Sequence, residues 1–242
     1  MSMSSQLPRL TTVSTGNEEL DMRLGGGIPH PSLVLMEGDN GTGKTALCAQ
    51  FTKGYLMDGM RVVYVTTENT VRHFLEQARN ISIDLTDYFL KGQLTVLSSN
   101  IRGARWDRDR ARAAAEALIK FAESGVARYS ALIIDSMSQI LHYLGDGEIH
   151  TLLTSLRGVV RRGTTVIVTL HPGVVGESVV REFAAASDVY MRLTLGEIGG
   201  RLVKVINVVK IRGAPTLAET SIAFDVDPAF GIKVVPLALA KV

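Results

Sequence analysis

Short apolar runs alternate with helical patterns along most of the chain. The runs are rich in β-branched residues and mostly continuous, which is typical of parallel strands covered on both faces. They predict strands at residues 32–37, 61–66, 94–97, 131–134 and 164–170. Apolar positions at helical spacing between them predict helices at residues 44–57, 70–79, 105–124 and 149–162. This alternation predicts an α/β fold, with a mostly parallel central sheet and helices on both faces.

The C-terminal stretch has a different pattern. Residues 189–195, 202–211, 221–226 and 232–235 read as successive strands joined by short links that contain glycine or proline. Short links favour hairpins, so we expect an antiparallel extension of the sheet. Residues 1–12 are polar and predict a flexible lead-in, and no linker divides residues 13–242. We therefore expect a single domain from residue 13 to residue 242.

Composition narrows the class of protein. The chain has 242 residues, of which 46% are hydrophobic and 21% are charged, as in a globular protein with a sizeable core. The net charge is only +2, which argues against a strong general attraction for nucleic acid. A single cysteine, Cys48, excludes an intramolecular disulfide and suits a reducing compartment. No secretory signal or stretch of about 18 apolar residues is visible, so we expect a cytoplasmic protein.

One motif carries recognisable chemistry. The eight residues between the first predicted strand and the first predicted helix fit G-x-x-x-x-G-K-S/T: Gly38, Asp39, Asn40, Gly41, Thr42, Gly43, Lys44 and Thr45. Glycines let successive backbone N–H groups converge on phosphate oxygens, and the helix N-terminus adds a positive dipole. The motif predicts a P-loop that binds ATP. Lys44 would contact the β- and γ-phosphates, and the Thr45 hydroxyl would bind Mg²⁺.

Two carboxylates follow other predicted strands. Asp135 ends the strand at 131–134 and would hold Mg²⁺ with Thr45, because ligands of such sheets bind where the strands end. Glu68 follows the strand at 61–66, where it could be the catalytic base that orients water toward the γ-phosphate. It could equally be a capping or first-turn acid of the next helix. The spacing leaves both interpretations open.

Thr169 and His171 end the predicted strand at 164–170 and are candidate sensors of the γ-phosphate. A lone histidine after a strand is more often a plain loop residue. The position on the same sheet edge as the P-loop keeps the sensing role open.

The motifs resemble a known family. Residues 14–16, Leu20-Asp21 and Leu24-Gly25-Gly26-Gly27-Ile28-Pro29, followed by the P-loop, look like the opening of KaiC-type ATPases of the RecA superfamily. VTTE (residues 65–68) resembles their catalytic-glutamate segment, and Lys210-Ile211-Arg212-Gly213 resembles their K-x-R motif. SIDLTDYFLKG (residues 82–92) and VIVTLHP (residues 166–172) look most like the archaellum H family (FlaH), the single-domain KaiC-like component of archaeal flagella.

The resemblance implies a RecA-like P-loop NTPase that assembles as a homo-oligomeric, hexameric ring with ATP between subunits. Lys210 and Arg212 would reach the γ-phosphate held by a neighbouring subunit; the alternative is a strand edge protected by cations. KaiC domains generally carry two consecutive glutamates where this chain has Glu68-Asn69, so we expect slow or absent ATP hydrolysis.

The expected function is that of an ATP-binding, nucleotide-gated regulatory or assembly subunit of the archaellum motor. The resemblance implies partners in the motor ATPase and scaffold ring proteins, at the cytoplasmic face of the membrane-embedded motor. A RecA/RadA-like DNA-dependent ATPase and a KaiC-like signalling ATPase are the alternatives. We expect no nucleic acid ligand, because residues 144–150 and 171–178, the segments that face DNA in RecA-like proteins, carry no lysine or arginine.

An arginine-rich stretch, residues 102–112, is the remaining cationic feature. Asp107 and Asp109 partly neutralise it, so local ion pairs at a helix start are the simpler interpretation. Trp106 among these charges would be a protein-contact residue if it were exposed.

Overall fold

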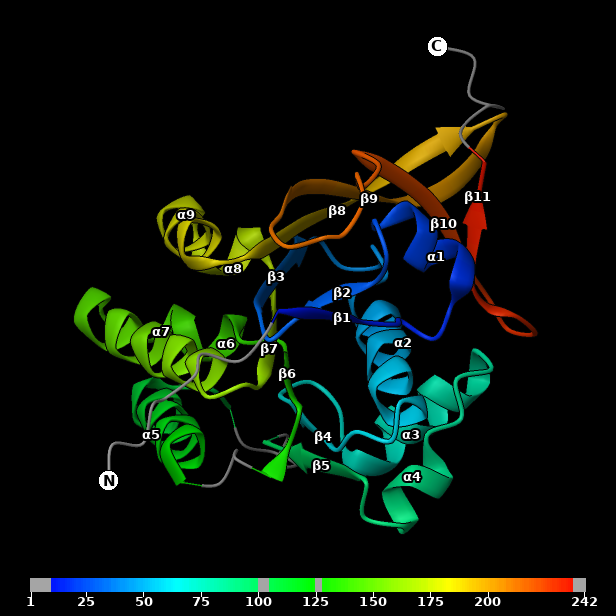
Figure 1. The fold of residues 1–242 in the computed structure, drawn as a ribbon. Helices are drawn as coiled ribbons and strands as arrows, with labels where there is room; N and C mark the ends of the chain where they lie inside the picture. The colour runs from blue at the N-terminus through cyan, green and yellow to red at the C-terminus, as the bar shows by residue number, and fades with distance from the viewer. Residues whose placement is uncertain (1–9, 100–104, 125–127, 237–242) are drawn as a thin grey trace, which may run out of the picture.

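A computed structural model describes residues 10–99, 105–124 and 128–236 (Figure 1). Its main feature is a nine-stranded sheet of order β11-β10-β9-β8-β3-β7-β6-β4-β5. The strands of this sheet are β3 (Leu33–Gly38), β4 (Val62–Thr66), β5 (Leu94–Ser98), β6 (Ala131–Asp135), β7 (Thr165–Leu170), β8 (Val189–Ile198), β9 (Arg201–Ile211), β10 (Ser221–Asp227) and β11 (Gly231–Val235). A separate two-stranded sheet pairs β1 (Thr11–Val13) with β2 (Ile28–His30).

The two halves of the large sheet differ in direction. Strands β8, β3, β7, β6, β4 and β5 pair in parallel. Beyond β8 each pairing is antiparallel: β9 pairs with β8, β10 with β9 and β11 with β10. The predicted α/β fold, with a mostly parallel sheet and an antiparallel C-terminal extension, is confirmed.

Helices cover both faces of the parallel strands. Figure 1 shows α2, α3 and α4 on one side and α5, α6 and α7 on the other. The helices are α1 (Glu18–Arg23), α2 (Lys44–Met57), α3 (Val71–Asn80), α4 (Thr86–Leu90), α5 (Arg108–Ser124), α6 (Ser138–His142), α7 (Asp146–Arg161), α8 (Pro172–Val175) and α9 (Glu177–Ala186).

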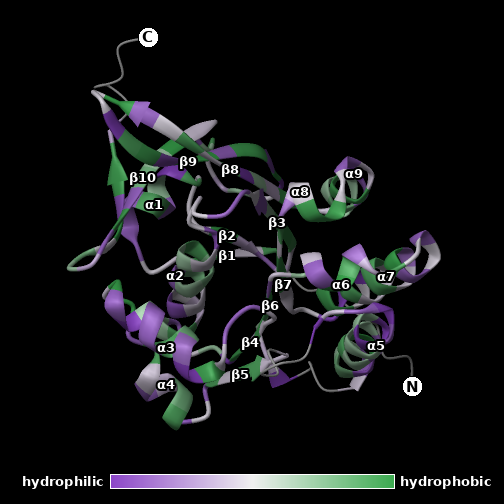
Figure 2. Ribbon diagram, turned by 180° about the vertical axis from the view of Figure 1, so that it is seen from behind, coloured by the Kyte–Doolittle hydropathy of each residue, from purple (hydrophilic) through white to green (hydrophobic). Residues whose placement is uncertain are grey.

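Successive residues of each parallel strand enter different cores. In β3, Val34 and Met36 pack in the core beneath α2, while Leu33 and Leu35 pack in the core beneath α7. Neighbouring side chains of a strand point to opposite faces, so a strand covered on both sides must be apolar throughout. This explains the continuous apolar runs, and Figure 2 shows the polar residues gathered on the helices and outer strands.

Some boundaries differ from the sequence prediction. Helix α7 begins at Asp146, before the predicted start at residue 149, because the Glu148 carboxylate accepts a hydrogen bond from the Gly145 N–H and caps the helix start. Residues 171–178, for which no helix was predicted, hold α8 and the start of α9. Strand β1 begins at Thr11, within the predicted lead-in, whose residues 1–9 lie outside the described ranges.

The N-terminal segment crosses α2 at Gly54. A Cβ atom at Gly54 would lie 2.1 Å from the Ser14 carbonyl oxygen and 2.6 Å from the Thr15 carbonyl carbon. Both contacts are with backbone, which cannot rotate away. Glycine is therefore required here to let the segment before α1 pack on the helix that follows the P-loop.

Gly54→Ala is expected to destabilise the fold by about 1–3 kcal/mol, the usual range for overpacking. Gly158→Ala is the matched control, because Gly158 also lies in a helix but a Cβ there would meet only the ends of two flexible side chains, Arg162 at 3.4 Å and Arg161 at 4.0 Å. That variant should be neutral or stabilising by up to about 1 kcal/mol. Thermal unfolding followed by circular dichroism measures both, and equal melting temperatures for the two variants would contradict the packing argument.

Candidate functional site

The candidate site lies where four neighbouring parallel strands end. The P-loop follows β3, His171 follows β7, Asp135 is the last residue of β6, and Glu68 lies two residues beyond β4. Because β3, β7, β6 and β4 are adjacent, their carboxyl ends form one edge of the sheet. Segments separated by more than a hundred residues thus meet at one place.

The P-loop has the backbone of a phosphate cradle. Gly41 and Gly43 have φ values of +79° and +93°, a left-handed conformation that favours glycine, and α2 begins directly after Gly43. A Cβ at Gly41 would meet nothing within 4 Å, so this part of the loop is open. A Cβ at Gly43 would lie 2.9 Å from the Phe224 ring. These glycines leave room for a ligand at the N-terminus of α2.

Lys44 folds back onto the loop. Its Nζ donates hydrogen bonds to the carbonyl oxygens of Gly38 (2.6 Å) and Asp39 (2.8 Å), and the side chain is buried. Burial lowers the pKa of Lys44, and the nearby Asp135 and Glu68 carboxylates oppose that shift. The ammonium is therefore held within the loop, where phosphate oxygens would replace the carbonyls as partners.

Thr45 and Asp135 are in direct contact. The Thr45 hydroxyl donates to Asp135 Oδ2 at 2.8 Å, and Thr169 donates to Oδ1 at 2.7 Å. A hydroxyl and a carboxylate side by side at a P-loop are the oxygen ligands that Mg²⁺ takes, with phosphate and water completing its shell. Among the described residues there is no cluster of three or more histidine, cysteine, aspartate or glutamate side chains suited to a metal ion. The donor set fits a nucleotide-bound Mg²⁺ rather than a metal held by protein alone.

Glu68 is held by two donors at the same edge. Its Oε1 accepts hydrogen bonds from the Ser136 hydroxyl (2.9 Å) and from His171 Nε2 (3.2 Å). The bond to His171 lowers the pKa of Glu68, and the Ser136 bond acts in the same direction. The N-cap of α3 is Thr70, whose hydroxyl accepts from the His73 N–H. The capping interpretation of Glu68 is therefore wrong.

Of the two candidate sensors, only His171 is next to Glu68. It lies at the start of α8, and its backbone N–H donates to the Ser138 hydroxyl at 2.8 Å. Thr169 is fully buried, and its hydroxyl is bonded to Asp135.

A cavity of about 300 Å³ brings most of these groups together. Its lining includes Lys44, Thr45, Glu68 and His171, together with Asn40, Gly41 and Gly43 of the P-loop and with Ala46, Lys204 and Val226. Lys204 of β9 pairs with Leu195 of β8. Leu195 lies two residues beyond Leu193, the residue that pairs with Gly38, so Lys204 reaches the P-loop side of the sheet. Its Nζ lies 3.7 Å from Asp225 Oδ1.

Three site residues have little or no signal in the local sequence. They are Lys204, Ser136 and Tyr64, whose hydroxyl donates to Asp135 Oδ2. Lys204 and Tyr64 look like ordinary strand residues, and only strand pairing places them at the site. Ser136 had a weak signal, since it directly follows the Asp-ending strand.

The K-x-R pair lies away from the carboxyl ends of the parallel strands, where the P-loop is. Lys210 of β9 pairs with Tyr190 of β8, and Tyr190 pairs with Leu35 of β3. Leu35 lies before the carboxyl end of β3, so Lys210 is separated from the P-loop along the strand direction. Lys210 Nζ donates to the Ala184 carbonyl at 2.7 Å, near the C-terminus of α9, whereas Arg212 is exposed. Neither cation lines the cavity at the P-loop of its own chain.

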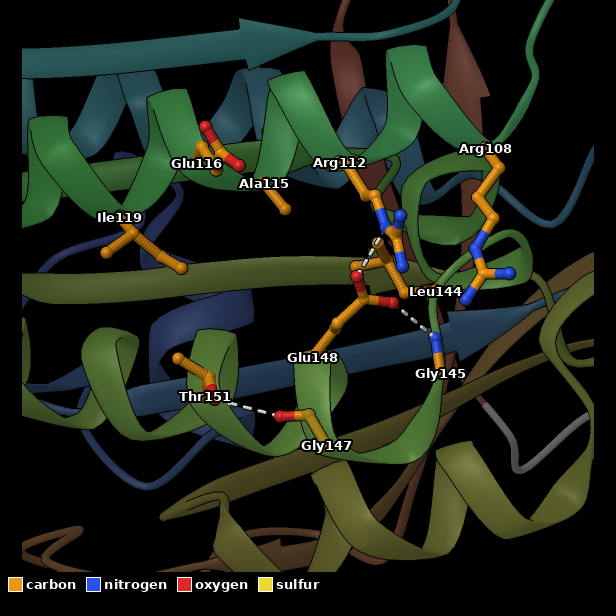
Figure 3. Close-up of a pocket in the computed structure, with 10 residues that line it drawn as sticks. All are labelled: Arg108, Arg112, Ala115, Glu116, Ile119, Leu144, Gly145, Gly147, Glu148 and Thr151. Carbon is orange, nitrogen blue, oxygen red and sulfur yellow. Dashed lines mark hydrogen bonds and ion pairs between the residues drawn. The ribbon is translucent and has the colours of Figure 1, made fainter.

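The arginine-rich stretch is described from Arg105 onward and forms local contacts. Arg110 lies over the Trp106 ring, 4.7 Å from its centroid. Trp106 is half-buried and packs against the core, so the exposure on which a protein-contact role would depend is only partial. Arg112 pairs with Glu148 at 2.6 Å in a pocket of about 520 Å³ between α5 and α7 (Figure 3). This pocket contains none of the predicted site residues.

Comparison with known proteins places the chain in a family. The family model described as "ATPase: KaiC" matches residues 13–238. The archaeal flagellar ATP-binding protein FlaH of Sulfolobus acidocaldarius is 37% identical and aligns over 95% of this chain and 99% of its own length.

Two solved structures are also similar. The crystal structure of the flagellar accessory protein FlaH from Methanocaldococcus jannaschii has a TM-score of 0.81 at 26% identity, over 94% of this chain and all of that one. The structure of a KaiC-like protein from Pyrococcus horikoshii has a TM-score of 0.73 at 25% identity, with the same coverage. The P-loop geometry, the family model and these relatives agree: the chain belongs to the KaiC family of ATPases and, within it, to the FlaH proteins.

Proposed function

We propose that this protein is an ATP-binding regulatory or assembly subunit of the archaeal flagellar motor, gated by nucleotide and slow or inactive in hydrolysis. The observation that carries the proposal is the pre-formed P-loop, with Lys44 held in the loop and Thr45 bonded to Asp135. The flagellar role rests on the relatives, whose names describe a flagellar ATP-binding protein.

The site has separate places for the phosphates, the metal ion and the nucleotide base. Residues 38–45 would bind the phosphates, and Thr45 with Asp135 would hold Mg²⁺, which shields phosphate charge when bound. Next to the phosphate cavity lies a second one of about 340 Å³ that shares Thr45, Ala46 and Val226 with it. Its walls combine Phe74 with the amides of Gln77 and Asn80. An apolar slot with a few polar groups suits a nucleotide base.

The contacts of Glu68 support the proposal of slow hydrolysis. A general base works best with a pKa near the operating pH, and the hydrogen bonds from His171 and Ser136 shift the pKa of Glu68 further below that range. The carboxylate is ionised and can orient a water molecule, but it accepts a proton weakly. Asn69 supplies no second carboxylate. His171 is bonded to Glu68 and is the N-cap residue of α8. A change at the γ-phosphate position that moves Glu68 would therefore reach α8 through His171.

A ring of subunits would give Lys210 and Arg212 a role. Both lie away from the P-loop of their own chain, so they can reach only a nucleotide bound by another chain. A cation supplied in trans is an established way to stabilise transferring phosphate. We expect ATP to promote assembly of a hexamer in which Arg212 faces the neighbouring P-loop.

The expected location is the cytoplasmic face of the motor, beside the motor ATPase and the scaffold ring. No helix in the described ranges is long and apolar enough to cross a membrane. We propose that membrane association is indirect, through these partners. DNA is not an expected ligand, because residues 144–150 and 171–178 carry no lysine or arginine.

Lys44→Ala is expected to weaken ATP binding by about 100-fold or more, since a charged hydrogen-bond donor is lost from the loop. Lys120→Ala, on the exposed face of α5, is the control and should bind like the wild type. Isothermal titration calorimetry measures both affinities. Wild-type affinity in Lys44→Ala would refute the site.

Glu68→Gln should retain ATP binding and lower turnover by about 10²-fold or more if Glu68 orients the attacking water. Glu76→Gln, an exposed residue of α3 paired with Arg72, is the control. Phosphate release is measured with and without the motor ATPase, and with single-stranded DNA. Equal turnover in the wild type and Glu68→Gln would show that Glu68 is not a working base, and stimulation by DNA would favour the DNA-dependent alternative.

Arg212→Ala should weaken ATP-promoted assembly and leave ATP binding to the isolated chain unchanged. Arg72→Ala removes an equally exposed arginine and should assemble normally. Light-scattering mass with and without Mg²⁺-ATP is the measurement. A mass that does not change with ATP in the wild type, or that changes equally in Arg212→Ala, would count against the trans role.

A further inference from the structure

A buried tyrosine contacts Asp135, the carboxylate of the proposed Mg²⁺ site. Tyr64 is in the middle of β4 and fully buried in the core that contains α2 and α3. Its ring is stacked on Phe74 of α3, with centroids 4.0 Å apart and an interplanar angle of 29°. Its hydroxyl donates a hydrogen bond to Asp135 Oδ2 at 2.8 Å. A core aromatic residue thus contacts the carboxylate that faces the P-loop.

Three hydroxyl groups fix the Asp135 carboxylate. Thr45 and Tyr64 both donate to Oδ2, whereas Thr169 donates to Oδ1. Asp135 is only 4% exposed, so water supplies little compensation for its charge. Thr45 is the hydroxyl that would bind Mg²⁺, and Thr169 lies on the other oxygen. Tyr64 is therefore the donor that fixes Oδ2 from the core side.

Tyr64 is also a dependable donor. The side chain is fully buried, and its hydroxyl lies 2.8 Å from Asp135 Oδ2. Its stacked ring has little freedom to turn the hydroxyl away. Phenylalanine would fill the same space on Phe74 but would leave Oδ2 without this donor.

We propose that Tyr64 is a positioning residue for the metal: its hydroxyl orients the Asp135 carboxylate and so sets how strongly nucleotide binding depends on Mg²⁺. This inference rests on the proposed binding of Mg²⁺-ATP. Groups that orient a metal ligand typically affect metal affinity about 10–100-fold without touching the metal. Phe74 also lines the proposed base cavity, so the Tyr64–Phe74 stack connects the two ends of the nucleotide site.

Tyr64→Phe tests the role of the hydroxyl alone. Binding of a fluorescent ATP analogue is titrated with Mg²⁺ and, separately, measured in excess EDTA. We expect the Mg²⁺ concentration for half-saturation to rise about 10–100-fold, with affinity in EDTA within about twofold of the wild type. Tyr55→Phe is the matched control, because Tyr55 is equally buried, in α2, and its hydroxyl is not bonded to Asp135. It should leave both values unchanged.

A merely structural role gives a different result. Tyr64→Phe would then lose affinity equally with and without Mg²⁺, and that outcome, like an unchanged Mg²⁺ dependence, overturns the inference. If Tyr64→Phe does not fold, Tyr64→Met removes the same hydroxyl with an adaptable apolar side chain, and an unaltered Mg²⁺ dependence in that variant also overturns the inference. A wild-type chain that binds no nucleotide refutes the proposed function instead.

Discussion

A carboxylate that ends a buried strand must receive hydrogen bonds from the protein, and Asp135 obtains them from the elements that build the site. Thr45 donates from the first turn of α2, Tyr64 from β4, and Thr169 from β7. Each bond to a charged acceptor is stronger than one between neutral groups. The bonds hold the start of the P-loop helix against three neighbouring strands, β4, β6 and β7. The proposed phosphate and metal positions depend on this arrangement, because Lys44 and Thr45 are adjacent in the chain.

The proposed distinction between an energy-converting enzyme and a nucleotide-dependent regulator rests on Glu68. Its carboxylate is placed near the P-loop but is already bonded to Ser136 and His171. The lower pKa makes it a poorer base while preserving its charge. Because His171 begins α8, a ligand that competes for Glu68 would also affect the segment that leads to α9. The proposed function, with nucleotide sensing and slow turnover, rests on this arrangement.

Local signals in the sequence predict the parts of the fold that depend on short-range patterns. The apolar runs of the parallel strands, the P-loop glycines and Asp135 are each visible within a few residues, and the structure has the predicted strands and fold class. Glu68 was ambiguous because capping and catalysis favour the same residue at a strand end; only the contacts of Thr70 and His171 separate them. Lys204 reaches the P-loop only through the β8–β9 register, and Tyr64 reaches Asp135 only through the pairing of β4 with β6. Such long-range pairings have no local signature.

The most direct test of the account is a crystal structure of the protein with Mg²⁺ and a slowly hydrolysed ATP analogue. The account predicts the triphosphate on residues 38–45, Mg²⁺ bound to the Thr45 hydroxyl beside Asp135, and Glu68 and His171 facing the γ-phosphate. An empty loop at saturating nucleotide, or a triphosphate bound elsewhere on the protein, would contradict it.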